Sequence, residues 1–242
     1  MPEPNRVKAA IREGRIALGY SMNFPSPHVI EILAPLNFDY VWLDGEHGPF
    51  SLESLEDHCR TADAVGITPI ARVPNIQTST ILQYLDRGIQ GILGPHIASK
   101  ADAEQLVKAC YFGPIGERSF GGNRGCDYDY ELTDRPGFYK TTNENTLVGA
   151  LLEDKGVIAN LEEIVSVDGI DYFSIGPNDF AQGLGYPGGK GRKEVIDAMQ
   201  DVYSRVRKAG RRAGGDVMRG MIVKESLVIS ARQFFDAQHA KP

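Results

Sequence analysis

The chain alternates short apolar runs with longer segments of helical periodicity, and this alternation constrains its fold more than any other feature. Eight runs are strand candidates, and they cover residues 15–22, 39–44, 68–73, 91–95, 147–153, 171–176, 212–218 and 226–231. Most of them are apolar throughout, which is typical of parallel strands that are buried on both faces. Strands that alternate with helices predict βα units and a parallel sheet.

The segments between these runs carry signals for the start and the end of helices. Ser51 precedes an amphipathic segment that ends at Gly66, and Ser26 is placed in the same way before residues 27–36. Further helical patterns cover residues 78–88, 99–111, 160–167 and 192–210. Eight strands with intervening helices predict an α/β fold, a single (βα)8 TIM barrel domain over residues 1–242. A doubly wound open sheet is the alternative, but no GxGxxG motif follows the first run.

Two segments depart from the repeating pattern. Residues 113–140 are rich in glycine and tyrosine and weakly periodic, so we expect a long loop after the fourth βα unit. Loops of that length inside compact domains usually have a function. The chain ends soon after Phe235, so we expect the C-terminal helix to be short.

Charge and composition exclude several classes of protein. The chain has 26 Lys and Arg against 32 Asp and Glu, a net charge of −6, so we expect no nucleic-acid partner. No apolar run approaches the ~20 residues of a membrane helix, and the charged N-terminus lacks the apolar core of a signal peptide. Three scattered cysteines are too few for a disulfide framework and favour a reducing, cytoplasmic location.

Polar residues stand where the predicted strands end. In a βα barrel these ends meet at one mouth, where catalytic residues lie. The residues concerned are Asp44, Glu46 and His47 after the second run, Arg72 after the third, Glu153 after the fifth, and Gly176, Pro177, Asn178 and Asp179 after the sixth. The sequence therefore predicts a carboxylate-rich site with one guanidinium and one imidazole.

These residue types suit the chemistry of an enolate. Glu153 and Asp179 offer carboxylate oxygens to a hard divalent cation such as Mg²⁺ or Mn²⁺. Arg72 offers a planar fork of donors to a carboxylate or an enolate oxygen. Histidine is the usual residue for proton transfer near neutral pH, so His47 is the candidate acid/base, with Asp44 or another acid to orient it. No lysine stands at a strand end, which argues against a Schiff-base mechanism.

Each residue also has a structural interpretation. Asp44 can cap the turn that follows it, and Arg72 can simply form an ion pair with Asp44 or Glu153. The Gly-Pro-Asn-Asp sequence at 176–179 is a common turn composition. The recurrence of polar groups at successive strand ends favours the site. His96 also follows a strand candidate and is a weaker candidate, whereas His58 lies inside a helical segment and is expected at the surface or in packing.

Five motifs between about Arg15 and Gly189 together resemble the 4-hydroxy-2-oxo-heptanedioate (HpcH/HpaI) aldolase family of metal-dependent, class II pyruvate aldolases. They are WLDGEHGPF, IARVP, LDRGIQGILGPHI, GERSFGG and VDGIDYFSIGPNDFAQGLGYPG. The resemblance implies a barrel of the phosphoenolpyruvate/pyruvate type in a homo-oligomer, a hexamer or a trimer. It implies reversible addition of a pyruvate enolate to an aldehyde, with Mg²⁺, Mn²⁺ or Co²⁺ as cofactor.

The same resemblance implies roles for individual residues. Glu153 and Asp179 would be the metal ligands, and Arg72 would hold the keto oxygen of pyruvate. His47 would be the general acid/base, with Asp44 beside it and Asp86 as the acid that pairs with it. The backbone at Gly176, Pro177, Asn178 and Asp179 would receive the carboxylate of pyruvate.

Two departures from the family leave other functions open. Leu151 stands where the family usually has glutamine, and the similarity fades after Gly210. Related enolate chemistry is therefore an alternative: oxaloacetate decarboxylation, a carbon–carbon bond-forming synthase, or an acyl-CoA lyase, although no clear basic entrance for CoA is present. A barrel that binds an oxo acid without catalysis is the second alternative.

Overall fold

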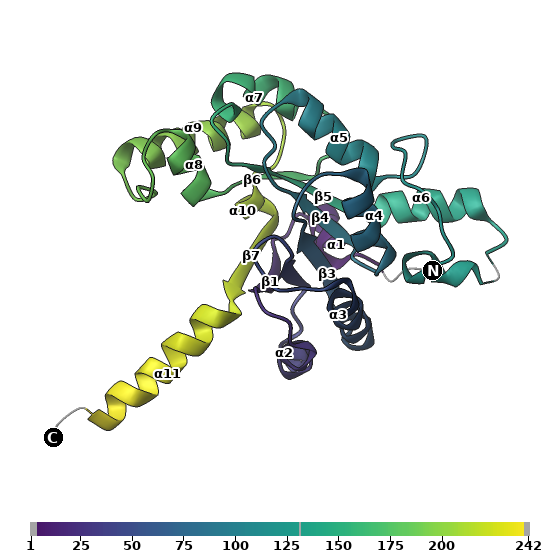
Figure 1. The fold of residues 1–242 in the computed structure, drawn as a ribbon, viewed down its shortest axis with the longest axis horizontal. Coiled ribbons are helices and arrows are strands. Elements are labelled where there is room, and N and C mark those ends of the chain that lie inside the picture. Colours follow the sequence, from purple (N-terminus) through teal and green to yellow (C-terminus); the bar gives the residue numbers. More distant parts are fainter. Residues whose placement is uncertain (1–3, 131, 240–242) are drawn as a thin grey trace.

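The computed structural model describes residues 4–130 and 132–239, and in that part of the chain seven strands form one parallel sheet. The strands are β1 (Ala17–Met22), β2 (Tyr40–Asp44), β3 (Thr68–Arg72), β4 (Gly91–Gly94), β5 (Leu147–Leu152), β6 (Tyr172–Ile175) and β7 (Met218–Ile222). Their order across the sheet is β6-β5-β4-β3-β2-β1-β7, and every neighbouring pair is parallel. The sheet is a half-barrel whose outer side carries the connecting helices (Figure 1).

Six helices form at the segments where the sequence signals predict them, and others form outside those segments. They are α1 (Arg6–Glu13), α2 (Pro27–Leu33), α3 (Leu52–Val65), α4 (Thr78–Asp86), α5 (Lys100–Cys110), α6 (Arg135–Asn145), α7 (Val157–Val165), α8 (Pro177–Gly183), α9 (Lys193–Lys208), α10 (Gly214–Val217) and α11 (Val223–His239), with 3-10 turns η1 (Ala34–Leu36) and η2 (Arg124–Asp129). Ser51 caps α3 by accepting from the Ser54 amide, and Gly66 ends that helix with φ 71°. No helix in the described ranges is long and apolar enough to cross a membrane.

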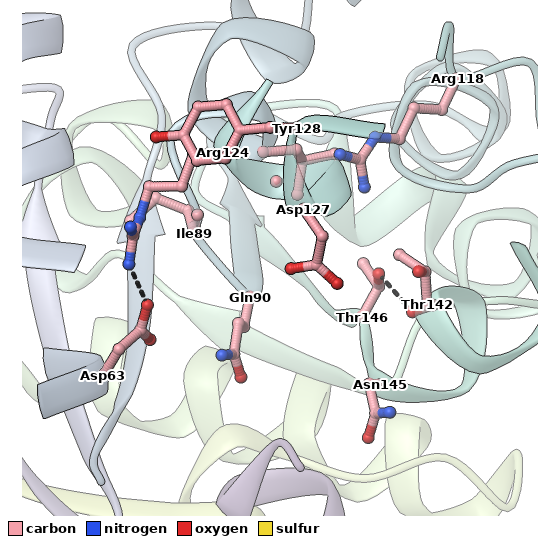
Figure 2. A pocket seen from close by; sticks show the side chains of 13 residues that line it. Asp63, Ile89, Gln90, Arg118, Arg124, Asp127, Tyr128, Thr142, Asn145 and Thr146 are labelled. Carbon is pink, nitrogen blue, oxygen red and sulfur yellow. Dashed lines mark hydrogen bonds and ion pairs between the residues drawn. The ribbon is translucent and has the colours of Figure 1, made fainter. Parts of the chain in front are cut away.

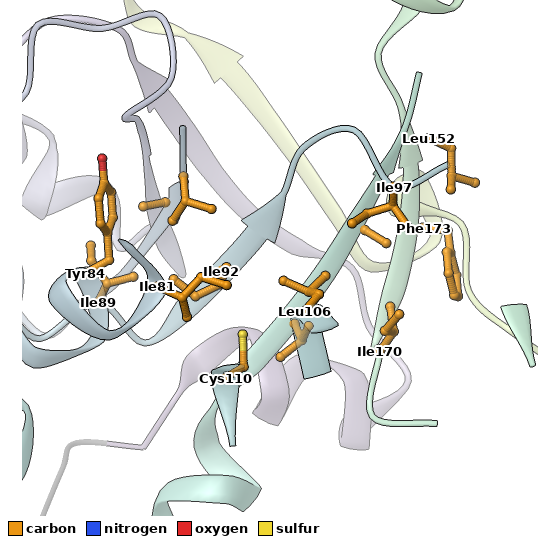
Figure 3. Packing of buried hydrophobic residues seen from close by; sticks show 14 of the residues in the cluster. Ile81, Tyr84, Ile89, Ile92, Ile97, Leu106, Cys110, Leu152, Ile170 and Phe173 are labelled. Carbon is orange, nitrogen blue, oxygen red and sulfur yellow. The ribbon is translucent and has the colours of Figure 1, made fainter. Parts of the chain in front are cut away.

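Side chains of each strand divide alternately between two apolar clusters, as the period of two requires. On β2, Val41 and Leu43 join the outer cluster under the helices, whereas Tyr40 and Trp42 join an inner cluster. Figure 3 shows the outer cluster, which includes Ile92 of β4 and Leu106 and Cys110 of α5. The inner cluster is the interior of the half-barrel.

Helix α1 covers the inner cluster from the end where the strands begin. Val7 and Ala10 of this helix are fully buried in that cluster. The Arg6 amide donates to Thr68 Oγ1 at 2.9 Å, and Asn5 Nδ2 donates to the Gln90 carbonyl at 3.0 Å, just before β4. One end of the half-barrel is thus closed, and the predicted site lies at the other.

The first six predicted strands are confirmed, but the last two are wrong. Of residues 212–218, only Met218 is in a strand, and Ala213 makes an isolated bridge to Phe173 of β6. Residues 226–231 lie inside α11. Short apolar runs do not distinguish strand from helix by periodicity, and no Gly or Pro bounds this one. A complete (βα)8 barrel is therefore not observed.

The long loop and the C-terminus also differ from expectation. The segment 113–140 contains η2 and the first turn and a half of α6 rather than only irregular chain. The last helix, α11, has 17 residues, and Figure 1 shows it extending away from the sheet. Of its described residues only Val223 is buried.

Candidate active site

Arg72 lies at the centre of the polar cluster at the carboxyl ends of the strands. Its side chain, 13% exposed, points from the end of β3 toward two carboxylates that follow from β2. Nε and Nη2 donate to Asp44 at 2.7–3.0 Å, and Nη1 lies 3.1 Å from Glu46 Oε2. Burial alone would lower the pKa of the guanidinium, but the hydrogen bond and charge of Asp44, with Glu46 and Glu153, raise it on balance. Arg72 is thus a fixed cation held in one orientation.

His96 connects this pair to the carboxylates after β5. Its Nε2 lies 3.4 Å from Glu46 Oε1, and its Nδ1 lies 3.1 Å from Asp154 Oδ2 and 3.6 Å from Glu153 Oε1. Its backbone φ is 55°, a left-handed conformation that is uncommon for a residue with a Cβ. Burial opposes protonation, but Glu153, Asp154 and Glu46 raise the pKa of the imidazole overall.

Glu153 is the most buried acid of the cluster, at 1% exposure. Its Oε1 accepts from the His96 amide at 3.2 Å, and a Cβ at Gly176 would overlap its Oε2. Burial, with the nearby charges of Glu46 and Asp179, raises the pKa of this carboxyl, although the His96 amide and imidazole oppose the shift. Gly176 is therefore glycine because β6 ends directly beside this carboxylate.

Asp179 faces the same cavity as Glu153. It lies in the first turn of α8, directly after Gly176 and the exposed Pro177 and Asn178. A cavity of about 550 Å³ is lined by His96, Glu153, Asp154 and Asp179. Within the described ranges, no group of three or more His, Cys, Asp or Glu side chains is arranged to hold a metal ion.

Of the two candidates inferred from the resemblance, the His47 side chain lies at the exposed edge of this cluster and Asp86 pairs outside it. The His47 side chain is 64% exposed, and its nearest charged neighbour is Glu46, at 4.0 Å. Asp86 lies at the end of α4, and its nearest basic atom is Nη2 of the buried Arg118, at 3.5 Å. In the described residues, His47 is thus near Glu46 and Asp86 is near Arg118, so a single chain does not bring His47 and Asp86 together as a pair.

The sequence placed Glu46 after the second strand but assigned it no role. It joins Arg72 to His96, although neither its type nor its place in the Asp-Gly-Glu-His stretch gave it a role. The signal lies in the turn: the Gly48 amide donates to the Asp44 carbonyl at 2.9 Å, so the chain doubles back after β2. That tight turn returns Glu46 to the mouth.

A second polar cavity, of about 360 Å³, lies at the opposite end of the sheet (Figure 2). Gln90 and Thr146, which directly precede β4 and β5, line it with Arg118 and Arg124. Arg124 pairs with Asp63 there. None of the predicted site residues lines this cavity, so it is separate from the Arg72 cluster.

Comparison with known proteins gives consistent matches over most of the chain. The sequence model of the family described as HpcH/HpaI aldolase/citrate lyase matches residues 21–237. A 4-hydroxy-2-oxovalerate aldolase of Rhodococcus jostii is 36% identical over 211 residues, covering 87% of this chain and 80% of the relative. A hydroxypyruvate/pyruvate aldolase of Roseovarius nubinhibens is 33% identical over 215 residues, covering 88% and 83%.

The solved structures agree on the fold. The crystal structure of an HpcH/HpaI aldolase from Desulfitobacterium hafniense superimposes with a TM-score of 0.88, at 20% identity, over 97% of each chain. At that identity the likeness concerns the arrangement of the backbone alone.

Proposed function

Since the chain belongs to the HpcH/HpaI aldolase/citrate lyase family, we propose that it is a divalent-metal-dependent aldolase that cleaves a 4-hydroxy-2-oxo acid into pyruvate and an aldehyde. The observation that carries the proposal is the placement of Arg72. A partly buried guanidinium held by Asp44 and Glu46, at the mouth that also contains Glu153, is a preorganised donor for an anionic oxygen.

The carboxylates at this mouth fit a hard divalent cation. Glu153 is buried beside other acids, so its ionised form needs a compensating positive charge. Magnesium typically binds through one or two carboxylates and keeps several waters, so the pair Glu153 and Asp179 matches its preference without a cage of three side chains. These two residues would hold the ion. When bound, it would supply Lewis-acid stabilisation of the oxo-acid oxygens.

The chain's own residues suit each stage of the cleavage. Arg72 donates to the 2-oxo oxygen, on which negative charge develops as the C3–C4 bond breaks. A base takes the proton of the 4-hydroxyl, C4 leaves as the aldehyde carbonyl, and the bonding electron pair becomes the pyruvate enolate. Return of one proton to C3 then gives the methyl group of pyruvate. The backbone between Gly176 and Asp179 would receive the substrate carboxylate.

His47 is the proposed acid/base for these proton transfers. Its exposed side chain can reach a substrate from the solvent side. Its amide donates to Asp44 Oδ1 at 3.3 Å, so the turn that carries His47 is connected to the ion pair of Asp44 with Arg72. Asp86 is proposed as its acidic partner in the assembled protein, since the contacts within one chain leave the two apart.

The proposed protein is a homo-oligomer, a hexamer or a trimer, that acts in a reducing cytoplasm. Helix α11 exposes Leu227, Phe234 and Phe235, and the outer face of β1 exposes Leu18, so two copies could each cover what the other leaves open. The three cysteines are free and buried, as suits a reducing compartment.

The test of the function is exchange of the pyruvate methyl protons with D₂O, followed by NMR, with Mg²⁺, Mn²⁺ or Co²⁺ and then with EDTA. We expect metal-dependent exchange, and pyruvate-dependent consumption of a small aldehyde. Full activity in EDTA would remove the metal from the proposal. Oxaloacetate decarboxylation without any aldehyde reaction would favour the alternative that Leu151 leaves open, and binding of pyruvate without exchange would favour a non-catalytic barrel.

A further inference from the structure

The interior of the half-barrel contains an apolar cavity directly beneath the Arg72 cluster. Its volume is about 350 Å³. Its lining includes six large side chains from β2 to β6: Tyr40, Trp42, Ile70, Leu93, Leu151 and Tyr172. Barrel interiors are normally filled by layers of such side chains. This one is not filled.

Small residues in the wall beside the gap between β6 and β7 help to leave this space open. Gly214, Gly215 and Gly220 line the cavity between β6 and β7. In place of strand pairing, an isolated bridge joins Phe173 of β6 to Ala213, just before α10. Gly215 and Gly220 are exposed, and they mark the side on which the cavity meets solvent. Lower in the barrel the interior is packed, because Tyr40 and Tyr172 lie over Gly19 and Gly149.

The polar cluster forms the layer directly above this space. Asp44, Arg72 and Glu153 each stand two residues after a lining residue of the same chain segment, Trp42, Ile70 and Leu151 respectively. Positions two apart on a strand share a face and are separated by roughly 6–7 Å. The Arg72 guanidinium lies 5.7 Å from the centre of the Trp42 ring, which connects the two layers.

We propose that this cavity is a subsite for an uncharged apolar group. The acceptor aldehyde carries that group, while the polar cluster around Arg72 holds the oxo acid with which the aldehyde reacts. The assignment of the group to an aldehyde rests on the proposed function. Of the described residues that line the cavity, none carries a charge, so an aldehyde ending in a carboxylate or a phosphate would lose its solvation there without compensation. An apolar cavity of about 150 Å³ holds a benzene ring, so this one has room for a ring or a chain of about six carbons.

The lone tryptophan of the chain makes occupancy measurable without catalysis. Trp42 lines the cavity, and the sequence contains one Trp, so intrinsic fluorescence reports this place alone. We expect unreactive alcohols from ethanol to hexanol to change the emission, with affinity rising roughly fourfold per methylene, as burial of a CH₂ group predicts.

Variants that reduce the volume provide the control. Leu151→Phe and Ser21→Leu fill the cavity from two sides, and each is expected to weaken hexanol binding at least tenfold. Ser21 is partly exposed, so its variant keeps the test valid if Leu151→Phe does not fold. Leu152→Phe is the matched control, because Leu152 is next to Leu151 in the chain but its side chain belongs to the outer cluster. Melting curves identify the variants that are folded.

The reaction gives the second readout. We expect kcat/KM to rise from acetaldehyde to hexanal, to become flat in Ser21→Leu, and to fall at least tenfold for an aldehyde of equal length with a terminal carboxylate. Metal-dependent methyl exchange of pyruvate without any dependence on chain length would overturn the subsite and leave the proposed function standing. Graded binding of the alcohols without methyl exchange would support the cavity as an apolar site and overturn the aldolase.

Discussion

Arg72 is held by Asp44 and Glu46, and this clamp makes its planar fork difficult to replace. We expect Arg72→Lys to lower kcat/KM by about 10²- to 10³-fold, because an ammonium group cannot reproduce two parallel donors toward the developing oxyanion. Steady-state kinetics measures the loss, and thermal denaturation should show a small change. Arg124→Lys, at the far end of the sheet, is the matched control. Normal turnover in Arg72→Lys would remove this residue from the mechanism.

Glu153 and Asp154 are adjacent acids that line the same cavity, but their surroundings differ. Glu153 is buried, whereas the Asp154 side chain is 40% exposed and pairs with His96. We expect Glu153→Gln to weaken Mn²⁺ binding at least about tenfold, and Asp154→Asn to change it less than about threefold. Calorimetric titration of the metal alone gives both values. Equal effects of the two substitutions would contradict the assignment of Glu153 as a ligand.

His58 is a structural histidine whose surroundings favour the neutral form. It is fully buried, its Nδ1 lies 2.5 Å from the Ser54 carbonyl, and its Nε2 accepts from the Ser26 amide at 2.8 Å. Burial lowers its pKa despite the hydrogen bond to Ser54 and the charge of Asp57. As the pH falls below about 6.5, the imidazole of His58 therefore takes up a proton in the unfolded chain before it does so in the folded one. The free energy of unfolding decreases over that range, and the stabilising contribution of neutral His58 is complete only above it.

The pH dependence of unfolding tests this arrangement. Between pH 7.5 and 5.5 the melting temperature of the native protein should fall more than that of His58→Gln, although the variant is less stable at pH 7.5. His28→Gln, an exposed change on α2, should keep the native pH dependence. A His58→Gln variant with an unchanged slope would show that other groups cause the loss.

At the residue scale the sequence predicted those site residues whose positions follow from strand ends. Asp44, Arg72 and Glu153 meet because parallel strands bring their carboxyl ends to one edge. The role of Glu46 was not predictable in that way, since it depends on a turn after the strand. The His47–Asp86 pairing came from resemblance alone, and the contacts within one chain do not form it.

At the scale of elements, one close approach between η2 and α4 limits how the long loop can be placed. A Cβ at Gly125 would overlap the Leu85 carbonyl oxygen, whereas a Cβ at Gly122 would meet its nearest neighbours at 3.6 Å, an ordinary contact. Gly125→Ala must therefore displace η2, and we expect it to lower the free energy of unfolding by about 1–3 kcal/mol. Gly122→Ala should change it by less than about 1 kcal/mol. Urea denaturation compares the two, and equal stabilities would show that the loop yields without cost.

Helices and strands were predictable where turn-forming residues stand at their ends and where tertiary contacts agree with the local sequence pattern. The first six strands and α3, α4, α5 and α9 meet that condition. Residues 226–231 do not, because their β-branched content favours a strand while the charged residues around them continue a helix. Residues 214–217 form α10, although two glycines there disfavour a helix, because Ala213 bridges to β6 and β7 pairs with β1.

For the whole molecule, the arrangement of α11 predicts self-association. Leu227, Val228, Ile229, Phe234 and Phe235 are each more than half exposed on this helix, an apolar surface that is rarely left open on a monomer. We expect light scattering after gel filtration to give a multiple of 26.5 kDa. The double change Phe234→Ser and Phe235→Ser should shift the mass toward the monomer, whereas Gln238→Ser should not. A native protein that elutes as a monomer would contradict the homo-oligomer.

The pairing of β1 with β7 has a consequence for the order of events during synthesis. Ala17 pairs with Met218, and Ser21 pairs with Ile222, so about two hundred residues separate the partners. β2 can join β1 soon after both have left the ribosome, but the other edge of β1 has no partner until β7, about two hundred residues later, has been translated. Contacts so distant along the chain also slow folding, because the loop that they close is long. In the nascent chain, one edge of β1 therefore stays exposed for a long time. A chaperone bound there would protect this edge from pairing with other chains.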